Sequence, residues 1–238
     1  MIKGEEFTRT RALIGDDGLD RLAASKILVF GIGGVGSYVC EALVRAGIGE
    51  FELVDGDIVD VTNINRQLIA MHITIGRPKT DVAAERMLDI NPDVRVRPRH
   101  CFYRPENDGE FDFSGFDYIV DAVDDVEAKV SIIVKAAEAG VPVISSMGTG
   151  NKMDPSAFRI ADIWDTRICP LARAMRRELR RYGVGHVKTV YSEEVPKLSY
   201  RGTPATISFV PAAAGLLIAK GVVEDLLSGA GDMLPKQT

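Results

Sequence analysis

The chain has 238 residues, of which 46% are hydrophobic and 26% charged, and its formal net charge is −5. This composition is that of an ordinary globular protein with room for one α/β core and an appendage. The negative charge excludes nucleic-acid binding driven by the charge of the whole molecule, so any such contact must use a local basic patch.

The N-terminal stretch MIKGEEFTRTRALIG lacks the apolar h-region of a secretory signal, so we expect a cytoplasmic protein. The first clear element is KILVFG at 26–31, a continuous apolar run typical of a buried parallel strand. The segment after it has helical spacing and is predicted to end at Gly47, a residue suited to the C′ position. EFELVD at 50–55 is the second predicted strand. The apolar stripe of the helix comprises Val35, Val39, Ala42, Leu43 and Ala46.

Strands and helices continue to alternate through the first 150 residues. The predicted elements are helices at 77–91 and 127–140 and strands at 93–99, 116–125 and 141–146. Pro78 stands in the first turn of one helix, where proline is favoured. This alternation predicts a Rossmann-like α/β fold with a doubly wound, mostly parallel sheet.

The alternation breaks after residue 150. AFRIADI, HVKTVYS and ATISFV suggest strands, and we expect them to extend the sheet in antiparallel fashion. A terminal helix is predicted at 211–227 with Pro211 first. Pro211 and Lys220 interrupt this apolar stretch, so no membrane partner is expected. We predict a single domain over 1–238, with a nucleotide-binding core at 1–150 and an extension at 151–238.

The segment GIGGVG lies between the first strand and its helix. Glycines there let the backbone turn tightly and approach an anion, while the helix N-terminus adds free N–H groups and a partial positive charge. Asp55 follows about twenty residues later, where an acid can bind ribose hydroxyls. The pattern predicts a nucleotide site that fits either NAD or ATP, and a tight turn without a ligand is the alternative. The glycines are Gly31, Gly33, Gly34 and Gly36.

Polar residues downstream favour ATP over NAD. Asn63 and Arg66 are three residues apart, so a helical turn would point them the same way, and Lys79 begins the next predicted helix. Asp121 and Asp124 flank a strand end, where open α/β sheets bind ligands. Two cations suit a triphosphate, and a carboxylate suits Mg²⁺. A hydride transfer needs neither the triphosphate nor the metal. Each residue alone is explained equally well as a surface or turn residue.

Assembled, these motifs resemble the ubiquitin-activating-enzyme superfamily of ATP-dependent adenylators. GIGGVGS, LVDGDIVDVTNINRQ, GRPKTDVAAERMLDINP, DAVDD and VPVISS carry the resemblance. It implies that Asp55 binds ribose and that Asp124 serves Mg²⁺. Through TRTRALIG it also implies a homodimer in which Arg11 reaches the partner's triphosphate. The further expected ATP contacts are Asp57, Asn63, Arg66, Gln67, Lys79 and Asp121, and the expected catalytic residues are Arg11, Arg66, Lys79 and Asp124.

The second half is similar to one branch of this superfamily, the tRNA threonylcarbamoyladenosine dehydratases. ADIWDTRICPLARAMRRELRRYGV and VKTVYSEEVP carry the similarity, although Cys169 stands where we expect an acid. The resemblance implies that ATP adenylates the carboxylate of threonylcarbamoyladenosine beside a tRNA anticodon, and that ring closure then displaces AMP. The alternatives are activation of the C-terminus of a ubiquitin-like sulfur-carrier protein, nicotinamide-dependent oxidoreduction, and a non-catalytic ATP-dependent scaffold.

The three cysteines, Cys40, Cys101 and Cys169, show no C-x-x-C spacing, so no zinc is expected. Carrier-activating relatives often bind zinc through such pairs, which disfavours that alternative. Cys40 is predicted to lie in the core. Cys169 is expected to be an ordinary thiol, because a nucleophile needs a depressed pKa. A cysteine desulfurase or a sulfur acceptor protein stays open as a partner.

PLARAMRRELRRYG at 170–183 combines an apolar helical stripe with a basic face. The predicted stripe is Leu171, Met175, Leu179 and Tyr182. The five arginines are Arg173, Arg176, Arg177, Arg180 and Arg181. Such a local cationic surface suits phosphate-backbone contacts, and we expect tRNA to bind there. A solvated helix face or a dimer contact is the alternative.

Overall fold

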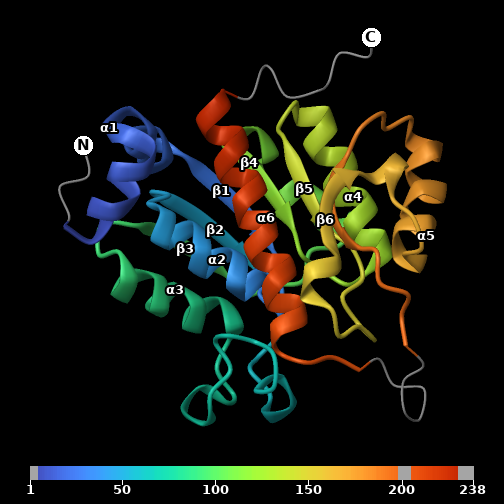
Figure 1. The fold of residues 1–238 in the computed structure, drawn as a ribbon, viewed down its shortest axis with the longest axis horizontal. Helices are drawn as coiled ribbons and strands as arrows, with labels where there is room; N and C mark the ends of the chain where they lie inside the picture. The colour runs from blue at the N-terminus through green and yellow to red at the C-terminus, as the bar shows by residue number, and fades with distance from the viewer. Residues whose placement is uncertain (1–4, 198–204, 230–238) are drawn as a thin grey trace.

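A computed structural model describes residues 5–197 and 205–229. Its centre is a seven-stranded sheet with the strand order β3-β2-β1-β4-β5-β7-β6 (Figure 1). The strands are β1 (Lys26–Phe30), β2 (Glu50–Val54), β3 (Arg95–Arg99), β4 (Tyr118–Asp121), β5 (Val143–Ser146), β6 (Phe158–Asp162) and β7 (Lys188–Ser192). The helices are α1 (Thr8–Ala24), α2 (Gly36–Ala46), α3 (Lys79–Ile90), α4 (Val126–Ala139), α5 (Pro170–Leu179) and α6 (Phe209–Ser228).

Strand directions confirm the predicted doubly wound, mostly parallel sheet. All strand pairs from β3 to β7 are parallel, and β6 at the edge pairs antiparallel with β7. The expectation that HVKTVYS is antiparallel was wrong for its pairing with β5. Between β5 and β7 the chain passes through β6 and helix α5, and this crossover returns β7 parallel to β5.

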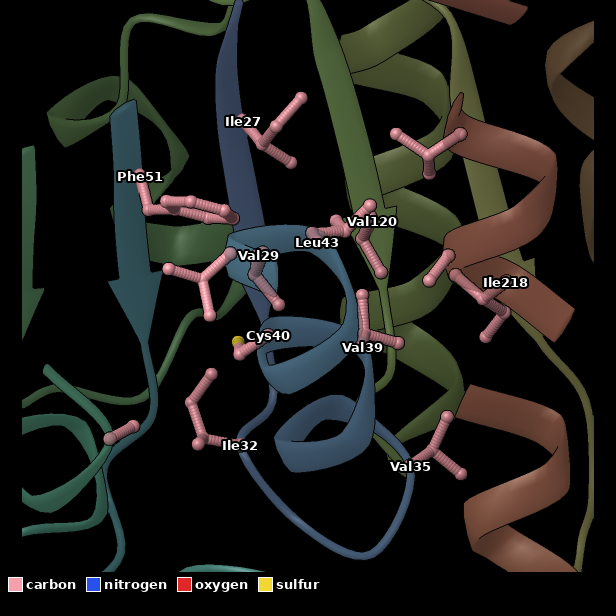
Figure 2. Packing of buried hydrophobic residues seen from close by; sticks show 14 of the residues in the cluster. Ile27, Val29, Ile32, Val35, Val39, Cys40, Leu43, Phe51, Val120 and Ile218 are labelled. Carbon is pink, nitrogen blue, oxygen red and sulfur yellow. The ribbon is translucent and has the colours of Figure 1, made fainter. Parts of the chain in front are cut away.

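Helices cover both faces of the sheet, and α6 crosses one face in Figure 1. On that face, α2 and α6 pack on alternate side chains of β1 and β4, among them Val29 and Val120. Figure 2 shows Val39 and Leu43 of α2 beside them. On the other face, Leu28 and Phe30 pack against α4 and a group of aromatic rings. This burial of both faces explains why the central strands are continuously apolar.

The segment ATISFV is not a strand, which corrects the expectation for 205–210. Helix α6 begins at Phe209, so Pro211 is its third residue instead of its first. Apolar residues recur every fourth position here, which is typical of a helix with one buried stripe against the sheet. The stripe comprises Val210, Ala214, Ile218, Val222 and Leu226. None of the helices within 5–197 and 205–229 combines the length and apolarity of a membrane span.

A largely buried polar cluster links α6 to the sheet through hydrogen bonds. The carboxylate of Asp225 accepts hydrogen bonds from Tyr118 Oη at 2.6 Å and from Lys188 Nζ at 2.5 Å. Burial, followed by the neighbouring carboxylate, raises the pKa of Tyr118 well above its usual range. Three elements distant in sequence, β4, β7 and α6, therefore meet at one carboxylate.

Replacing Asp225 by alanine should lower the free energy of unfolding by about 3 kcal/mol, because the Lys188 ammonium and the Tyr118 hydroxyl lose their common acceptor. Urea denaturation followed by circular dichroism measures this change. Glu224→Ala is the matched control, since Glu224 pairs with Lys220 on the surface, and it should cost less than about 1 kcal/mol. Equal losses in the two variants would contradict the role of the buried cluster.

Candidate active site

The glycine turn after β1 brings strand, turn and helix into close contact. Gly31 has φ of +85°, and a Cβ atom there would lie 2.7 Å from the carbonyl oxygen of Ala122. A Cβ atom on Gly36 would lie 1.8 Å from the carbonyl oxygen of Gly31. Both positions therefore exclude larger residues. Gly33 and Gly34 lie between them and line a cleft. Gly36 does not line it and packs against the backbone of Gly31, which corrects its expected contact with ATP.

The cleft has a volume of about 900 Å³ and opens where the parallel strands β1, β2, β3, β4 and β5 end. Ligands of open α/β sheets bind at this edge. The predicted site residues that line it are Gly31, Gly33, Gly34, Asp55, Asp57, Asn63, Arg66, Gln67, Lys79 and Asp124. The structure thus brings together residues from a span of more than ninety positions, as the order of the motifs predicted.

Asp55 follows β2 and faces the glycine turn. Its carboxylate accepts hydrogen bonds from the backbone N–H of Ile32 at 2.6 Å and of Asp57 at 2.8 Å. Burial raises the pKa of Asp55, and the Lys79 charge and the two N–H groups oppose that rise. A carboxylate held in this way has lone pairs left for the hydroxyls of a ribose.

Two cations face the cleft from the side of β2. Lys79, the first residue of α3, is 5% exposed, and its Nζ lies 2.6 Å from Oδ2 of Asp57. Arg66 donates from Nη1 to the carbonyl of Thr62 and to Oδ1 of Asn65, both at 2.9 Å. These contacts hold each cation while leaving further N–H groups for phosphate oxygens.

Asn63 and Gln67 are buried in the same wall. Oδ1 of Asn63 accepts from the N–H of Asp60 at 3.1 Å, which fixes the turn that presents Arg66. Gln67 is 6% exposed, and its Oε1 is buried without a hydrogen-bond partner. An unsatisfied buried polar atom costs about 1–3 kcal/mol. Asn63 and Gln67 both line the cleft, so this wall is polar.

Asp121 lies beneath the cleft instead of lining it, which corrects its expected contact with ATP. Its side chain is fully buried, with Lys129 Nζ at 2.9 Å from Oδ2. Ser145 donates to the same oxygen at 2.6 Å. These partners occupy the carboxylate, so Asp121 acts within the protein. The sequence indicated an acid at the end of β4 but not the buried lysine opposite it.

Asp124 lies on the turn that follows β4, and its side chain is exposed at the cleft. Next to it, Asp125 caps α4 by accepting from the N–H of Ala128 at 2.8 Å. No group of three or more His, Cys, Asp or Glu side chains suited to a metal occurs in the part of the chain that the structure describes. Mg²⁺ is commonly bound by one or two carboxylates, substrate phosphates and water, so Asp124 fits that arrangement.

Sequence reasoning missed two walls of the cleft. Phe102 and Tyr103 after β3 form one, and Phe102 is 54% exposed. Residues 146–150 after β5, with Ala205 and Thr206, form the other. The rule that ligands bind at strand ends could have found the segments at 102–103 and 146–150. The approach of Ala205 is a tertiary contact, in which its N–H donates to Oδ1 of Asn151 at 2.7 Å.

Helix α5 is amphipathic as predicted, but its arginines differ in environment. Arg176 turns inward, where Nη1 donates to the carbonyls of Ile163 and Thr166, so it does not belong to the basic surface. Arg180 lies over the Trp164 ring at 5.4 Å. Tyr182, expected on the apolar stripe, is 61% exposed.

The surface arginines of α5 begin close to the cleft. Leu171 in the first turn of the helix lines the cleft, and Arg173 is exposed two residues later. Arg177 and Arg181 are exposed and both pair with Glu178, which lowers the local positive charge. A basic face therefore remains, formed by Arg173 and Arg177 of α5 and by Arg180 and Arg181 in the 3-10 turn that follows it.

Arg11 lies on α1, outside the cleft of its own chain. Its Nε is 3.0 Å from Oδ1 of Asp16. It is not among the residues that line the cleft. A role in a second chain's cleft therefore stays a prediction.

The three cysteines differ in accessibility. Burial raises the pKa of Cys40 to about 12, which agrees with its predicted place in the core. Cys169 is 3% exposed and packs near Gly148. Cys101 is partly exposed and lines the cleft.

Iodoacetamide should therefore modify Cys101 in the native protein much faster than Cys40 or Cys169, because a buried thiol is inert. Peptide mass spectrometry after timed alkylation measures the three rates. A ligand in the cleft should slow the reaction at Cys101, and Cys101→Ser should remove the fast phase. Fast labelling at Cys169 would contradict the burial described here.

Comparison with known proteins places this geometry in a family. The model of the ThiF family matches residues 7–232. The chain is 39% identical to a tRNA threonylcarbamoyladenosine dehydratase of Bacillus subtilis, over 93% of this chain and 94% of that protein. The structure of E. coli tRNA N6-threonylcarbamoyladenosine dehydratase with ATP is 32% identical, with a TM-score of 0.91 over 98% of this chain and 100% of that one. Its complex with AMP gives a TM-score of 0.91 over 97% and 98%. The chain belongs to the ThiF family.

Proposed function

We propose that this protein is an ATP-dependent tRNA threonylcarbamoyladenosine dehydratase. The observation that carries the proposal is one cleft that combines the glycine turn, Asp55, two cations and Asp124. Similarity to enzymes of that name over nearly the whole chain supports the same activity. We include in the proposal a single adenylating domain over 1–238 and a cytoplasmic location.

In the proposed reaction, the modified nucleoside's carboxylate attacks the α-phosphorus of ATP, and the bond to pyrophosphate breaks. The carbamoyl group then attacks the activated carbonyl carbon, AMP leaves with the former carboxylate oxygen, and one proton is released. The glycine turn and the N-terminus of α2 bind phosphate, and Asp55 binds ribose. Lys79 and Arg66 stabilise the charge that gathers on the leaving pyrophosphate.

Asp124 would hold Mg²⁺ at the rim of the cleft, with phosphate oxygens and water as the remaining ligands. When bound, the ion would neutralise part of the triphosphate charge. We also propose a homodimer in which each Arg11 reaches the triphosphate in the partner's cleft. Much of the expected rate enhancement comes from orienting a carboxylate in line with the α-phosphorus.

Incubation with ATP, Mg²⁺ and tRNA that carries linear threonylcarbamoyladenosine tests the proposal. AMP should form in proportion to nucleoside that has lost one water, measured by mass spectrometry after digestion. tRNA without the modification is the control and should release no AMP above background. Unchanged nucleoside would contradict the proposal, and exchange of pyrophosphate that depends on a sulfur-carrier protein would favour activation of such a carrier.

We propose that the basic face formed by Arg173, Arg177, Arg180 and Arg181 binds the tRNA backbone. Arg180→Glu should raise the KM for tRNA several-fold, leave ATP binding near normal, and reduce the slope of log K against log salt by about 1. Filter binding over a range of salt concentrations measures that slope. Arg95→Glu is the control, because Arg95 is exposed on β3 at the opposite edge of the sheet. Equal effects on ATP and tRNA would contradict this role.

A further inference from the structure

A buried ion pair lies directly beneath the turn that carries Asp124. The side chains of Lys129 and Asp121 are both 0% exposed, and Nζ lies 2.9 Å from Oδ2. Lys129 is the fourth residue of α4, and Asp121 is the last residue of β4. The two residues therefore bracket the turn at 122–125, which forms one wall of the cleft.

The hydrogen bonds of this pair fix the turn itself. Nζ of Lys129 also donates to the carbonyl oxygen of Val123 at 3.1 Å. The N–H of Val123 donates to Oδ1 of Asp121 at 3.3 Å, and Ser145 of β5 donates to Oδ2 at 2.6 Å. Both peptide groups of Val123 are thus held, immediately before Asp124.

Fold stability alone does not account for this lysine. A buried ion pair often contributes no more stability than well-packed apolar residues of similar volume. A cation in the first turn of a helix also opposes the positive end of the helix dipole. The ammonium group does donate a hydrogen bond to the carbonyl of Val123, the residue before Asp124. On the following side, the Asp125 cap holds the chain.

We propose that Lys129 is a positioning residue that holds Asp124 in the orientation needed to bind the metal of a metal–ATP complex. The proposal rests on the proposed function, because it assumes that Asp124 and ATP share a metal ion. Lys129 acts through the Val123 carbonyl and touches neither ATP nor metal. Supporting groups of this kind commonly change metal affinity or activity by 10- to 100-fold when they are removed.

The decisive variant is Lys129→Met combined with Asp121→Asn. Lys129→Met alone leaves a buried carboxylate without its cation and is expected to unfold easily. The double variant removes both charges, keeps similar volumes, and leaves an amide that Ser145 still contacts. Thermal unfolding checks that it folds. The matched control is Lys188→Met combined with Asp225→Asn, which removes both charges of a partly buried ion pair away from the cleft.

Calorimetry measures the affinity for ATP with Mg²⁺ and, separately, with EDTA. The wild type should bind ATP more tightly with Mg²⁺, and Asp124→Asn should lose that gain. In the double variant the gain in ATP affinity from Mg²⁺ should be smaller by roughly tenfold or more, with the affinity in EDTA unchanged. The control with Lys188→Met and Asp225→Asn should keep the whole gain. A full gain in the folded double variant would overturn the positioning role. A wild type that binds no ATP would instead overturn the proposed function.

Discussion

Asp124→Ala is expected to lower the rate of AMP formation by roughly 100- to 1000-fold or more, the size of effect seen when one preorganised charge-stabilising group is lost. Its carboxylate is exposed in the cleft after β4, whereas that of Asp125, which also lines the cleft, caps α4. Because the side chain lies on an exposed turn, the free energy of unfolding should change by less than about 1 kcal/mol. Single-turnover AMP formation and thermal unfolding together separate the two effects.

Asp125→Ser is the matched control for Asp124→Ala. Asp125 is the neighbouring acid and caps α4 through the N–H of Ala128, and serine is also a favoured N-cap residue. The substitution therefore removes a charge from the same turn and keeps the cap. Most of the turnover should remain. If Asp124→Ala also kept a near-normal rate, the assignment of the metal-binding role to Asp124 would be wrong.

The core of the fold was predictable because its elements have strong local signals. After Lys26, KILVFG is apolar without interruption, since the rest of β1 is buried on both faces. Gly31 and Gly36 have no room for a Cβ atom, so the motif reflects steric contacts within the protein besides the proposed ligand binding. The cleft followed from the same order of elements, because parallel strands end at one edge of a sheet.

Other features depend on tertiary contacts that no local pattern reports. Helix α1 was not predicted, and its hydrophobic pattern is interrupted by a non-helical Gly15. The environment of Asp121 depends on Lys129. Local spacing places Lys129 on α4 but does not show that its side chain lies under the cleft. Arg176 has the sequence context of a surface arginine, yet the carbonyls of Ile163 and Thr166 draw it inward.

Lys79→Met is expected to lower kcat for AMP formation by roughly 100-fold or more, with the fold intact. Lys79 is buried in the cleft, but its partner Asp57 is 52% exposed at the side chain. Loss of the ammonium therefore leaves a carboxylate that water can solvate, and the cost in stability should be small. Methionine keeps most of the apolar stem in place.

Comparison of the change in kcat with the change in KM for the Lys79→Met variant tests the role of Lys79. Charge accumulates on the pyrophosphate oxygens as the bond to the α-phosphorus breaks, so an ammonium beside them stabilises the transition state more than bound ATP. kcat should then fall much further than the affinity for ATP. Lys79→Arg keeps the charge but changes its geometry, and it should recover part of the rate. A large rise in KM with unchanged kcat would instead mean that Lys79 stabilises the ground state and the transition state equally.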